Sequence, residues 1–187
     1  MKLFNIFVGI MGFFGLVFLI SRFFPHSYRI EKSITINLPV EQTYAYLNNM
    51  KYWNDWSPWN KSIDSTMVVF YSQVKTGKGA TQYFRGNLVG NGRFKITEST
   101  PNEKIQFHLS LNGGELAIYQ TFYLKNIGGQ TQLNWVDSGD VGNNPIYRFM
   151  LPSKISSQEQ GFEEGLKTIK EAAVSYTKAS ATEGKKE

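Results

Sequence analysis

The chain has 187 residues and a formal net charge of +5, from 20 Lys and Arg against 15 Asp and Glu. It contains no cysteine, which excludes a disulfide scaffold, a thiol nucleophile and a thiolate metal site. The basic residues are spread thinly, with no run longer than Lys185-Lys186, so the pattern does not predict nucleic-acid binding. Weak attraction to anionic lipid headgroups accounts for a charge of this size.

An uncharged, largely apolar run extends from Leu3 to Ile20. As a helix it would cover ~27 Å, close to the ~30 Å hydrocarbon core of a bilayer. The residues that follow, Ser21-Arg22-Phe23-Phe24-Pro25, lack the small-residue cleavage pattern of a secretory signal. We therefore predict a retained transmembrane helix within residues 1–24. A cleaved leader and a buried core helix are the alternatives.

The flanking charges give a prediction for the orientation of this single membrane span. Lys2 flanks one end, and Arg22, Arg29 and Lys32 follow the other. Short cytoplasmic flanks carry the excess of Lys and Arg. Because Arg29 and Lys32 belong to the predicted folded domain, the remaining flanks nearly balance. We place the amino terminus inside and the domain outside the cytoplasm.

Residues 25–178 are predicted to form one domain around one core. The domain begins with a strand over Tyr28–Ile36, in which the apolar residues Tyr28, Ile30, Ile34 and Ile36 share a face. A helix follows with Pro39 as its first residue, where the missing N–H costs nothing. A second, short helical turn is expected over Met50–Asp55.

From Thr66 onward the apolar residues recur with a period of two, and turns that contain Gly, Asn or Pro divide the sequence into six segments. Such a series predicts an antiparallel meander of hairpins. The predicted strands are Met67–Tyr71, Thr81–Arg85, Gly92–Glu98, Ile105–Leu111, Glu115–Leu124 and Gln130–Asp137.

A long amphipathic helix of about 24 residues is predicted after the strands. Pro152 is expected to separate it from a short turn over Pro145–Leu151, and residues 179–187 are expected to form a disordered tail. The predicted fold class is α+β: an antiparallel sheet wrapped around the long carboxy-terminal helix, preceded by one transmembrane helix. The helix's apolar stripe, which must cover the curved face of the sheet, comprises Ile155, Phe162, Leu166, Ile169, Ala173 and Tyr176.

Five short motifs between Tyr28 and Ala173 support a more specific fold. In chain order they are Ile34-Thr35-Ile36-Asn37-Leu38-Pro39-Val40-Glu41, Trp53-Asn54-Asp55-Trp56-Ser57-Pro58-Trp59, Gly77-Lys78-Gly79-Ala80, Ile96-Thr97-Glu98 with Pro101-Asn102-Glu103-Lys104-Ile105, and Phe162-Glu163-Glu164-Gly165-Leu166. Their order and spacing resemble the SRPBCC superfamily of polyketide cyclase/dehydrase and START-like lipid-transport domains. The resemblance implies the helix-grip fold. It leaves the function open among lipid carriers, aromatic cyclases and co-chaperones.

Residues suited to catalysis are scarce in this sequence. The two histidines are His26, between the predicted anchor and the domain, and His108, which strand alternation sends to the face opposite its apolar neighbours. Without clustered His, Cys or paired carboxylates, no metal site is predicted, and no cofactor is expected. Glu98 and Asp137 lie at the ends of predicted strands and are interpreted as rim or turn residues. We therefore predict no catalytic residue.

An apolar pocket between the sheet and the long helix is the predicted binding site. The tryptophan-rich segment is expected to close one end of it, either as a packing plug or as an aromatic mouth that grips a ligand. Gln120 lies mid-strand among apolar neighbours and would orient the polar end of a ligand. The predicted ligand-binding residues are Trp53, Trp56, Trp59, Phe107, Leu109, Ile118, Gln120, Phe122, Trp135, Phe162 and Leu166.

These features favour a membrane-anchored, non-catalytic domain that binds a hydrophobic small molecule or lipid. Two alternatives stay open. A cyclase or dehydratase-type enzyme would need a polar, paired cavity that includes Gln120. A protein-interaction module, similar to the co-chaperone branch of the superfamily, would have a collapsed cavity and an exposed sheet face.

Overall fold

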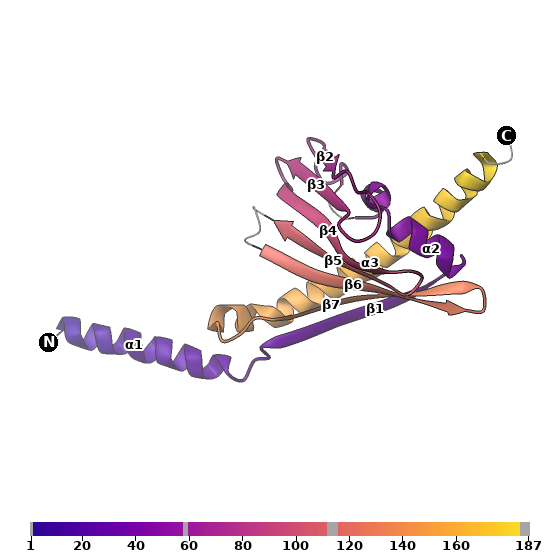
Figure 1. The fold of residues 1–187 in the computed structure, drawn as a ribbon. Helices are drawn as coiled ribbons and strands as arrows, with labels where there is room; N and C mark the ends of the chain where they lie inside the picture. Colours follow the sequence, from indigo (N-terminus) through magenta and orange to yellow (C-terminus); the bar gives the residue numbers. More distant parts are fainter. Residues whose placement is uncertain (1, 58–59, 112–115, 184–187) are drawn as a thin grey trace.

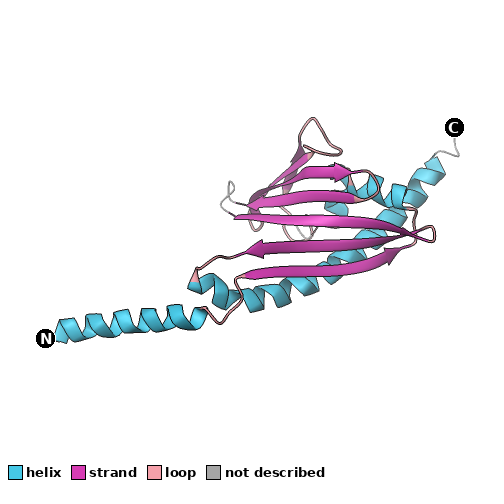
Figure 2. Ribbon diagram, turned by 60° about the horizontal axis from the view of Figure 1, so that its bottom comes forward, coloured by secondary structure: helices cyan, strands magenta, loops and turns pink. Residues whose placement is uncertain are grey.

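The computed structural model describes residues 2–57, 60–111 and 116–183. Its centre is a seven-stranded antiparallel sheet with the strand order β1-β7-β6-β5-β4-β3-β2, and the long helix α3 packs against one face of this sheet (Figure 1 and Figure 2). This is the predicted α+β architecture. The elements are α1 (Lys2–Ser21), β1 (Ser27–Ile36), α2 (Val40–Leu47), η1 (Met50–Asp55), β2 (Val68–Tyr71), β3 (Thr81–Gly86), β4 (Gly90–Thr100), β5 (Lys104–Leu111), β6 (Leu116–Ile127), β7 (Gln130–Asp140) and α3 (Pro145–Glu183).

Strands β2 to β7 form the predicted meander, in which each strand pairs with the next one along the chain. The β6–β7 hairpin turns at Gly128 and Gly129, whose φ angles of 64° and 84° lie in the left-handed region. A two-residue turn with positive φ at both positions favours glycine there. Strand β1 completes the sheet beside β7, with Ser27 opposite Asp140. The chain that follows α1 therefore lies next to the end of β7.

A β-bulge in β4 changes the face of the sheet to which Glu98 points. The register with β5 shifts between Ile96 and Glu98, and the intervening Thr97 donates a hydrogen bond from Oγ1 to the Gln106 carbonyl (3.2 Å). Glu98 pairs with Gln106, whereas Ile96 is buried on the opposite face. Strict alternation over the predicted strand Gly92–Glu98 would place Glu98 on the same face as Ile96, but an extra residue interrupts the period of two. Glu98 instead forms an ion pair with Lys104 (2.7 Å).

Helix α2 begins at Val40, one residue later than predicted. Pro39 occupies the cap position with φ −55° and ψ 149°, and its carbonyl accepts hydrogen bonds from the backbone N–H groups of Gln42 and Thr43. The Thr43 hydroxyl donates a hydrogen bond to the Thr131 hydroxyl at the start of β7 (3.1 Å). This contact fixes α2 against the sheet, and η1 follows as the predicted short helical turn.

Helix α3 is continuous from Pro145 to Glu183 and contains Pro152. The separate turn predicted over Pro145–Leu151 is therefore wrong. Asn144 caps the helix: its Oδ1 accepts hydrogen bonds from the backbone N–H groups two and three residues later (3.0 and 3.4 Å). A capped start lets the helix form ahead of Pro152, which then removes one backbone donor without ending the helix. The helix also continues past residue 179, where the tail was expected to begin.

The core lies between the sheet and α3, as the apolar stripe predicts. Phe107 and Phe122 are fully buried on the sheet side. Tyr176, towards the carboxy-terminal end of the stripe, is partly buried, and its hydroxyl accepts a hydrogen bond from the Tyr52 hydroxyl (3.0 Å). The stripe residues that are buried in α3 are Phe162, Leu166, Ile169 and Ala173.

Helix α1 extends away from the rest of the chain (Figure 1). Its segment Phe4–Ser21 has a mean hydropathy of 2.2, and only 6% of it is buried. The apolar run therefore does not form a buried core helix, which was one of the alternatives. Among the described residues, α1 is the one helix that is long and apolar enough to cross a membrane, and a signal sequence meets the same criteria of length and composition. The division into an anchor (1–24), a domain (25–178) and a tail stays a prediction.

Candidate functional site

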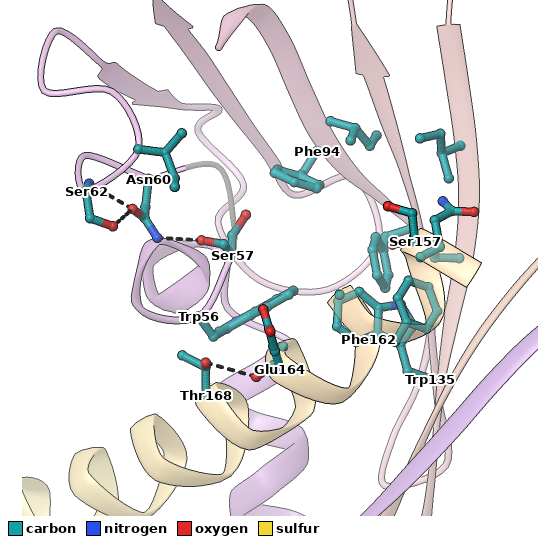
Figure 3. Close-up of a pocket in the computed structure, with 18 residues that line it drawn as sticks. Trp56, Ser57, Asn60, Ser62, Phe94, Trp135, Ser157, Phe162, Glu164 and Thr168 are labelled. Atoms are coloured by element: carbon teal, nitrogen blue, oxygen red, sulfur yellow. Dashed lines mark hydrogen bonds between the residues drawn. The ribbon is translucent and has the colours of Figure 1, made fainter. Parts of the chain in front are cut away.

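A cavity of about 430 Å³ lies between the inner face of the sheet, the middle of α3 and the segment that follows η1 (Figure 3). The sheet supplies its apolar wall, because side chains that alternate along neighbouring strands point to the same face. The residues of this wall are Phe94 from β4, Phe107 and Leu109 from β5, Ile118 from β6 and Trp135 from β7.

The opposite wall combines small and polar side chains of α3 with the segment after η1. Asn60 shapes that segment: its Nδ2 donates to the Ser57 carbonyl (2.7 Å), and its Oδ1 accepts from the backbone N–H of Ser62 (2.8 Å). The α3 residues recur at helical spacing and so share one face of the helix. They are Ser157, Gln158, Gly161, Phe162, Glu164, Gly165 and Thr168.

Seven of the predicted ligand-binding residues line this cavity, and three lie behind its wall. Trp53, Phe122 and Leu166 are buried in the core and do not line the cavity. Trp59 lies outside the described residues. Whether any of these residues contributes to binding stays a prediction. The seven that line the cavity are Trp56, Phe107, Leu109, Ile118, Gln120, Trp135 and Phe162.

Two tryptophans of the tryptophan-rich segment, Trp53 and Trp56, have different positions relative to the cavity. Trp53 is the plug: its Nε1 donates to the Leu47 carbonyl (2.8 Å), and its ring packs edge-on against Phe107 (4.8 Å between centroids). Trp56 is the wall: its ring lies 5.0 Å from that of Trp53 and meets Trp135 at 90° (5.7 Å). Trp53 therefore has the packing role considered for this segment, and Trp56 lines the cavity, where the gripping of a ligand stays a prediction.

The side chain of Trp135, a residue of β7, packs tightly against α3. Its ring stacks on Phe162 at a centroid distance of 4.3 Å and an interplanar angle of 16°. A Cβ atom at Gly165 would lie 2.7 Å from Cζ3 of Trp135, closer than atoms pack in proteins. Glycine at position 165 thus allows α3 to approach the indole.

Three polar atoms of the cavity-lining residues are buried and lack a hydrogen-bond partner among the described residues. They are Nε1 of Trp56, Nε1 of Trp135 and Oε1 of Gln158. A buried polar group without a partner costs about 1–3 kcal/mol. The two indoles meet edge to face, an arrangement that aromatic pairs prefer.

A buried carboxyl group lies behind the polar end of the cavity. Asp137 is 0% exposed; its Oδ1 accepts from the Tyr28 hydroxyl (3.4 Å) and its Oδ2 from Nε2 of Gln158 (3.2 Å). Gln120, its cross-strand neighbour, also hydrogen-bonds to it. The interpretation of Asp137 as a rim residue is therefore wrong. Strand β7 continues to Asp140, so residue 137 is not at a strand end, and β1 and α3 cover it.

Burial sets the ionisation of this group. It raises the pKa of Asp137, against the opposing effects of the Lys154 charge and of the hydrogen bonds from Tyr28, Gln158 and Gln120. Burial, followed by the charge and hydrogen bond of Asp137, raises the pKa of Tyr28 to about 12. Nζ of Lys154 donates to the Tyr28 hydroxyl (3.3 Å). Lys154, Tyr28 and Asp137 thus form a hydrogen-bonded chain that ends at the two amides in the cavity wall.

The histidines lie away from the cavity. His108 pairs across the strands with Tyr119 (5.6 Å between rings) on the face opposite Phe107, as the alternation predicts, and burial lowers its pKa. His26 is exposed and pairs with Asp140 (3.1 Å). Within residues 2–57, 60–111 and 116–183, no group of three His, Cys, Asp or Glu side chains is placed to hold a metal ion.

Sequence reasoning missed several residues of the site, and some of them carried a usable signal. Gln158 stands four residues before Phe162 and therefore on the same helical face, but a polar residue at that spacing was not assigned to the stripe. Gly161 and Gly165 also lie on α3 beside the cavity. Residues 60–63 carried no periodic signal, and the hydrogen bonds of Asn60 with Ser57 and Ser62 hold them beside the cavity.

No protein-family model matches the chain, and no curated protein matches it in sequence. Solved structures do match it. Aha1 from Colwellia psychrerythraea, whose solution structure is a dimer, is 20% identical, with a TM-score of 0.55 over 78% of this chain and 96% of Aha1. Ara h 8.0201 is 12% identical, with a TM-score of 0.55 over 80% of this chain and 99% of its own.

Protein BH1534 from Bacillus halodurans is 15% identical, with a TM-score of 0.57 over 78% of this chain and 96% of its own. At these identities the likeness concerns the fold and not the function. The strand order and the long helix described above agree with it. The chain has the helix-grip fold.

Proposed function

We propose that the protein binds a hydrophobic small molecule or lipid in this cavity, without catalysing a reaction, and that α1 holds it at a membrane. The observation that carries the proposal is the open cavity of about 430 Å³ between sheet and helix. This volume is in the range typical of small-molecule sites, which have apolar walls and a few polar groups. A module that acts only through its outer surface would not need such a space.

The composition of the wall indicates the kind of ligand. Phe107, Leu109 and Trp135 offer an apolar surface, and the amides of Gln120 and Gln158 are the polar groups at one end. Amides donate and accept hydrogen bonds without carrying charge. They suit a hydroxyl, ester or amide group better than a charged one, whose burial would need a counter-charge. The ligand is thus an apolar body with an uncharged polar group.

Membrane attachment gives this binding site its location. Only 6% of the segment Phe4–Ser21 is buried, and most of its residues are apolar. Exposed apolar side chains in such number favour lipid as their environment. Apolar molecules partition into bilayers, so a cavity tethered at the surface lies near its ligands. Retention of the protein in membranes after carbonate washing, with an intact amino terminus, is the expected result. Release by carbonate, or a mature protein that starts after α1, would show that α1 is no anchor.

One observation favours the enzyme alternative. The buried carboxyl of Asp137 has a raised pKa and lies directly behind Gln120 and Gln158, and a perturbed acid beside a cavity is a common property of catalytic sites. For Asp137 to act on a substrate, one of the two amides would have to move aside. Turnover that disappears in Asp137→Asn would therefore establish the enzyme in place of the binding protein.

Native mass spectrometry of the full-length, detergent-extracted protein tests the binding directly. We expect a co-purified small molecule in a one-to-one complex. Gly161 lines the cavity, and a Cβ atom there would meet nothing within 4 Å. Gly161→Phe should fill the cavity and abolish the complex, and Gly161→Ala should keep it. If the wild-type protein carries no ligand and binds no added lipid, the interaction-module alternative replaces this proposal.

A further inference from the structure

Four large apolar side chains are exposed near the junction between α1 and the rest of the chain. Phe23, Ile146, Tyr147 and Met150 are between 58% and 90% exposed. Phe23 follows α1, and the other three belong to the first two turns of α3. We call these four residues the junction patch. Large apolar residues that gather at one exposed place usually mark a contact surface.

The junction patch is held in place relative to the end of α1. Arg148, which is 5% exposed, donates from Nε to the Gly142 carbonyl (2.8 Å) and from Nη1 to the Ser21 carbonyl (3.5 Å). Its positive charge at the carboxy-terminal end of α1 also suits the helix dipole. The ring of Phe24 packs on that of Phe149 (4.6 Å between centroids). The first turn of α3 therefore moves with the end of α1.

The arrangement of the two helices puts the patch at one end of the domain. Helix α1 leads away from the domain, and α3 begins where α1 ends (Figure 1 and Figure 2). From there α3 extends away from α1 and past the cavity (Figure 1). If α1 spans a bilayer, the junction patch lies at the level where the chain leaves the lipid.

We propose that the junction patch docks into the headgroup region of the bilayer beside α1 and so fixes how the domain sits on the membrane. This inference rests on the proposed membrane anchor. Lipid is the occupant that the structure favours, because the largely exposed, apolar helix α1 ends two residues before Phe23 and is joined to the start of α3 by the Arg148–Ser21 hydrogen bond. Tyr and other aromatic residues are enriched at this level of membrane proteins. Tethering by α1 also keeps the patch near lipid at a high effective concentration.

The chain has no cysteine, so single-cysteine reporters can test the docking in the full-length protein. Met150→Cys would carry an environment-sensitive fluorophore in vesicles of phosphatidylcholine and phosphatidylglycerol that contain a headgroup-level spin-labelled quencher. We expect a blue-shifted emission that the quencher removes. Glu171→Cys is the matched control: it is exposed on the same helix, about 31 Å farther along, and its reporter should stay in water and unquenched.

Each other outcome is informative. Adding Ile146→Ser and Tyr147→Ser to Met150→Cys should reduce both the blue shift and the quenching. A reporter at 150 that stays in water while carbonate leaves the protein in the bilayer overturns the docking and leaves the anchor standing. Release by carbonate overturns both. A blue shift that vanishes on dilution into excess lipid shows that the patch meets a second copy of the chain, which also overturns the docking.

Discussion

Gly165 of α3 and Trp135 of β7 approach so closely that a Cβ atom on residue 165 would lie 2.7 Å from Cζ3 and 3.3 Å from Cη2 of the indole. The ring cannot move away, because Phe162 stacks on it at 4.3 Å. The distance between helix and sheet at the cavity thus depends on the absence of one methyl group. Trp135 lines the cavity, so the same contact sets the width of the binding site.

The first prediction concerns this contact. Gly165→Ala should destabilise the protein by about 1–3 kcal/mol, since overpacking forces the indole or the helix to shift. The gain in helix propensity from Gly to Ala, about 1 kcal/mol, opposes this effect but does not remove the clash. Chemical denaturation in detergent, followed by tryptophan fluorescence, measures the free energy of unfolding.

Gly161→Ala is the control for this measurement. It makes the same change one turn earlier on α3, where the new methyl group meets nothing within 4 Å. It should leave the stability unchanged or raise it by up to about 1 kcal/mol. Equal effects of the two substitutions would mean that α3 does not approach Trp135 as described.

The second prediction tests the buried stripe of α3. Leu166 is 2% exposed in the core, and Leu166→Ala should cost about 2–5 kcal/mol through lost burial and a residual cavity. Glu171 is exposed on the same helix, and Glu171→Ala should change the stability by no more than about 0.5 kcal/mol. Comparable losses in the two variants would place the stripe on the wrong face of the helix.

Much of the architecture could be predicted because it depends on periodicity. The alternation in Ile105–Leu111 places Phe107 and Leu109 inward, and the three- and four-residue spacing of Phe162, Leu166, Ile169 and Ala173 places α3 on the sheet. Both patterns are local properties of the sequence. The order of the motifs then distinguished the helix-grip fold from other arrangements of a sheet and a helix.

The errors occurred where a distant residue or one extra residue overrides the local pattern. Thr97 creates a bulge that no alternation reveals, and Asn144 starts α3 ahead of Pro152. Asp137 was placed at a rim because nothing in its neighbourhood shows that Tyr28 and Gln158 meet it from other elements. The cavity itself depends on such long-range contacts, so its polar end could be predicted only through Gln120.

The third prediction is a pH dependence of stability that arises from Asp137. Because burial raises the pKa of this carboxyl in the folded state, the folded protein holds the proton more tightly than the unfolded chain. Its contribution to stability is fully present below the ordinary aspartate pKa and is lost as the pH rises through the raised value. Asp137→Asn removes the titration. The stability of the variant relative to wild type should therefore increase as the pH rises through that window.

Asp64 supplies a control of opposite sign. Its carboxylate accepts hydrogen bonds from Thr66 and from the backbone N–H groups of Leu88 (2.7 Å) and Val89 (3.1 Å). These hydrogen bonds, chiefly the one from the Thr66 hydroxyl, lower the pKa of Asp64 to about 2. This group stabilises the fold above the ordinary aspartate pKa, and the stabilisation is lost as the pH falls towards 2. Denaturation series at several pH values should thus give opposite slopes for Asp64→Asn and Asp137→Asn. The same slope for both would contradict the raised pKa of Asp137.

The last prediction separates the two kinds of contact that the cavity offers. Gln120→Leu replaces an amide by a side chain of similar size, so it should weaken a long-chain alcohol by about 1–3 kcal/mol, through a polar group left unpaired, and leave the alkane of the same length unaffected. Trp56→Ala should weaken both ligands, because it removes apolar contact area that the alcohol and the alkane share. His108→Ala should change neither, since His108 lies on the other face of the sheet. Competition against a fluorescent alkyl probe in nanodiscs measures the effect of all three substitutions.

The Gln120→Leu variant needs a control for folding. It loses the hydrogen bond between Gln120 and Asp137, so we expect a small loss of stability, and thermal unfolding must confirm that the variant is folded at the assay temperature. If a folded Gln120→Leu weakens alcohol and alkane alike, the amide shapes the cavity and does not orient the ligand.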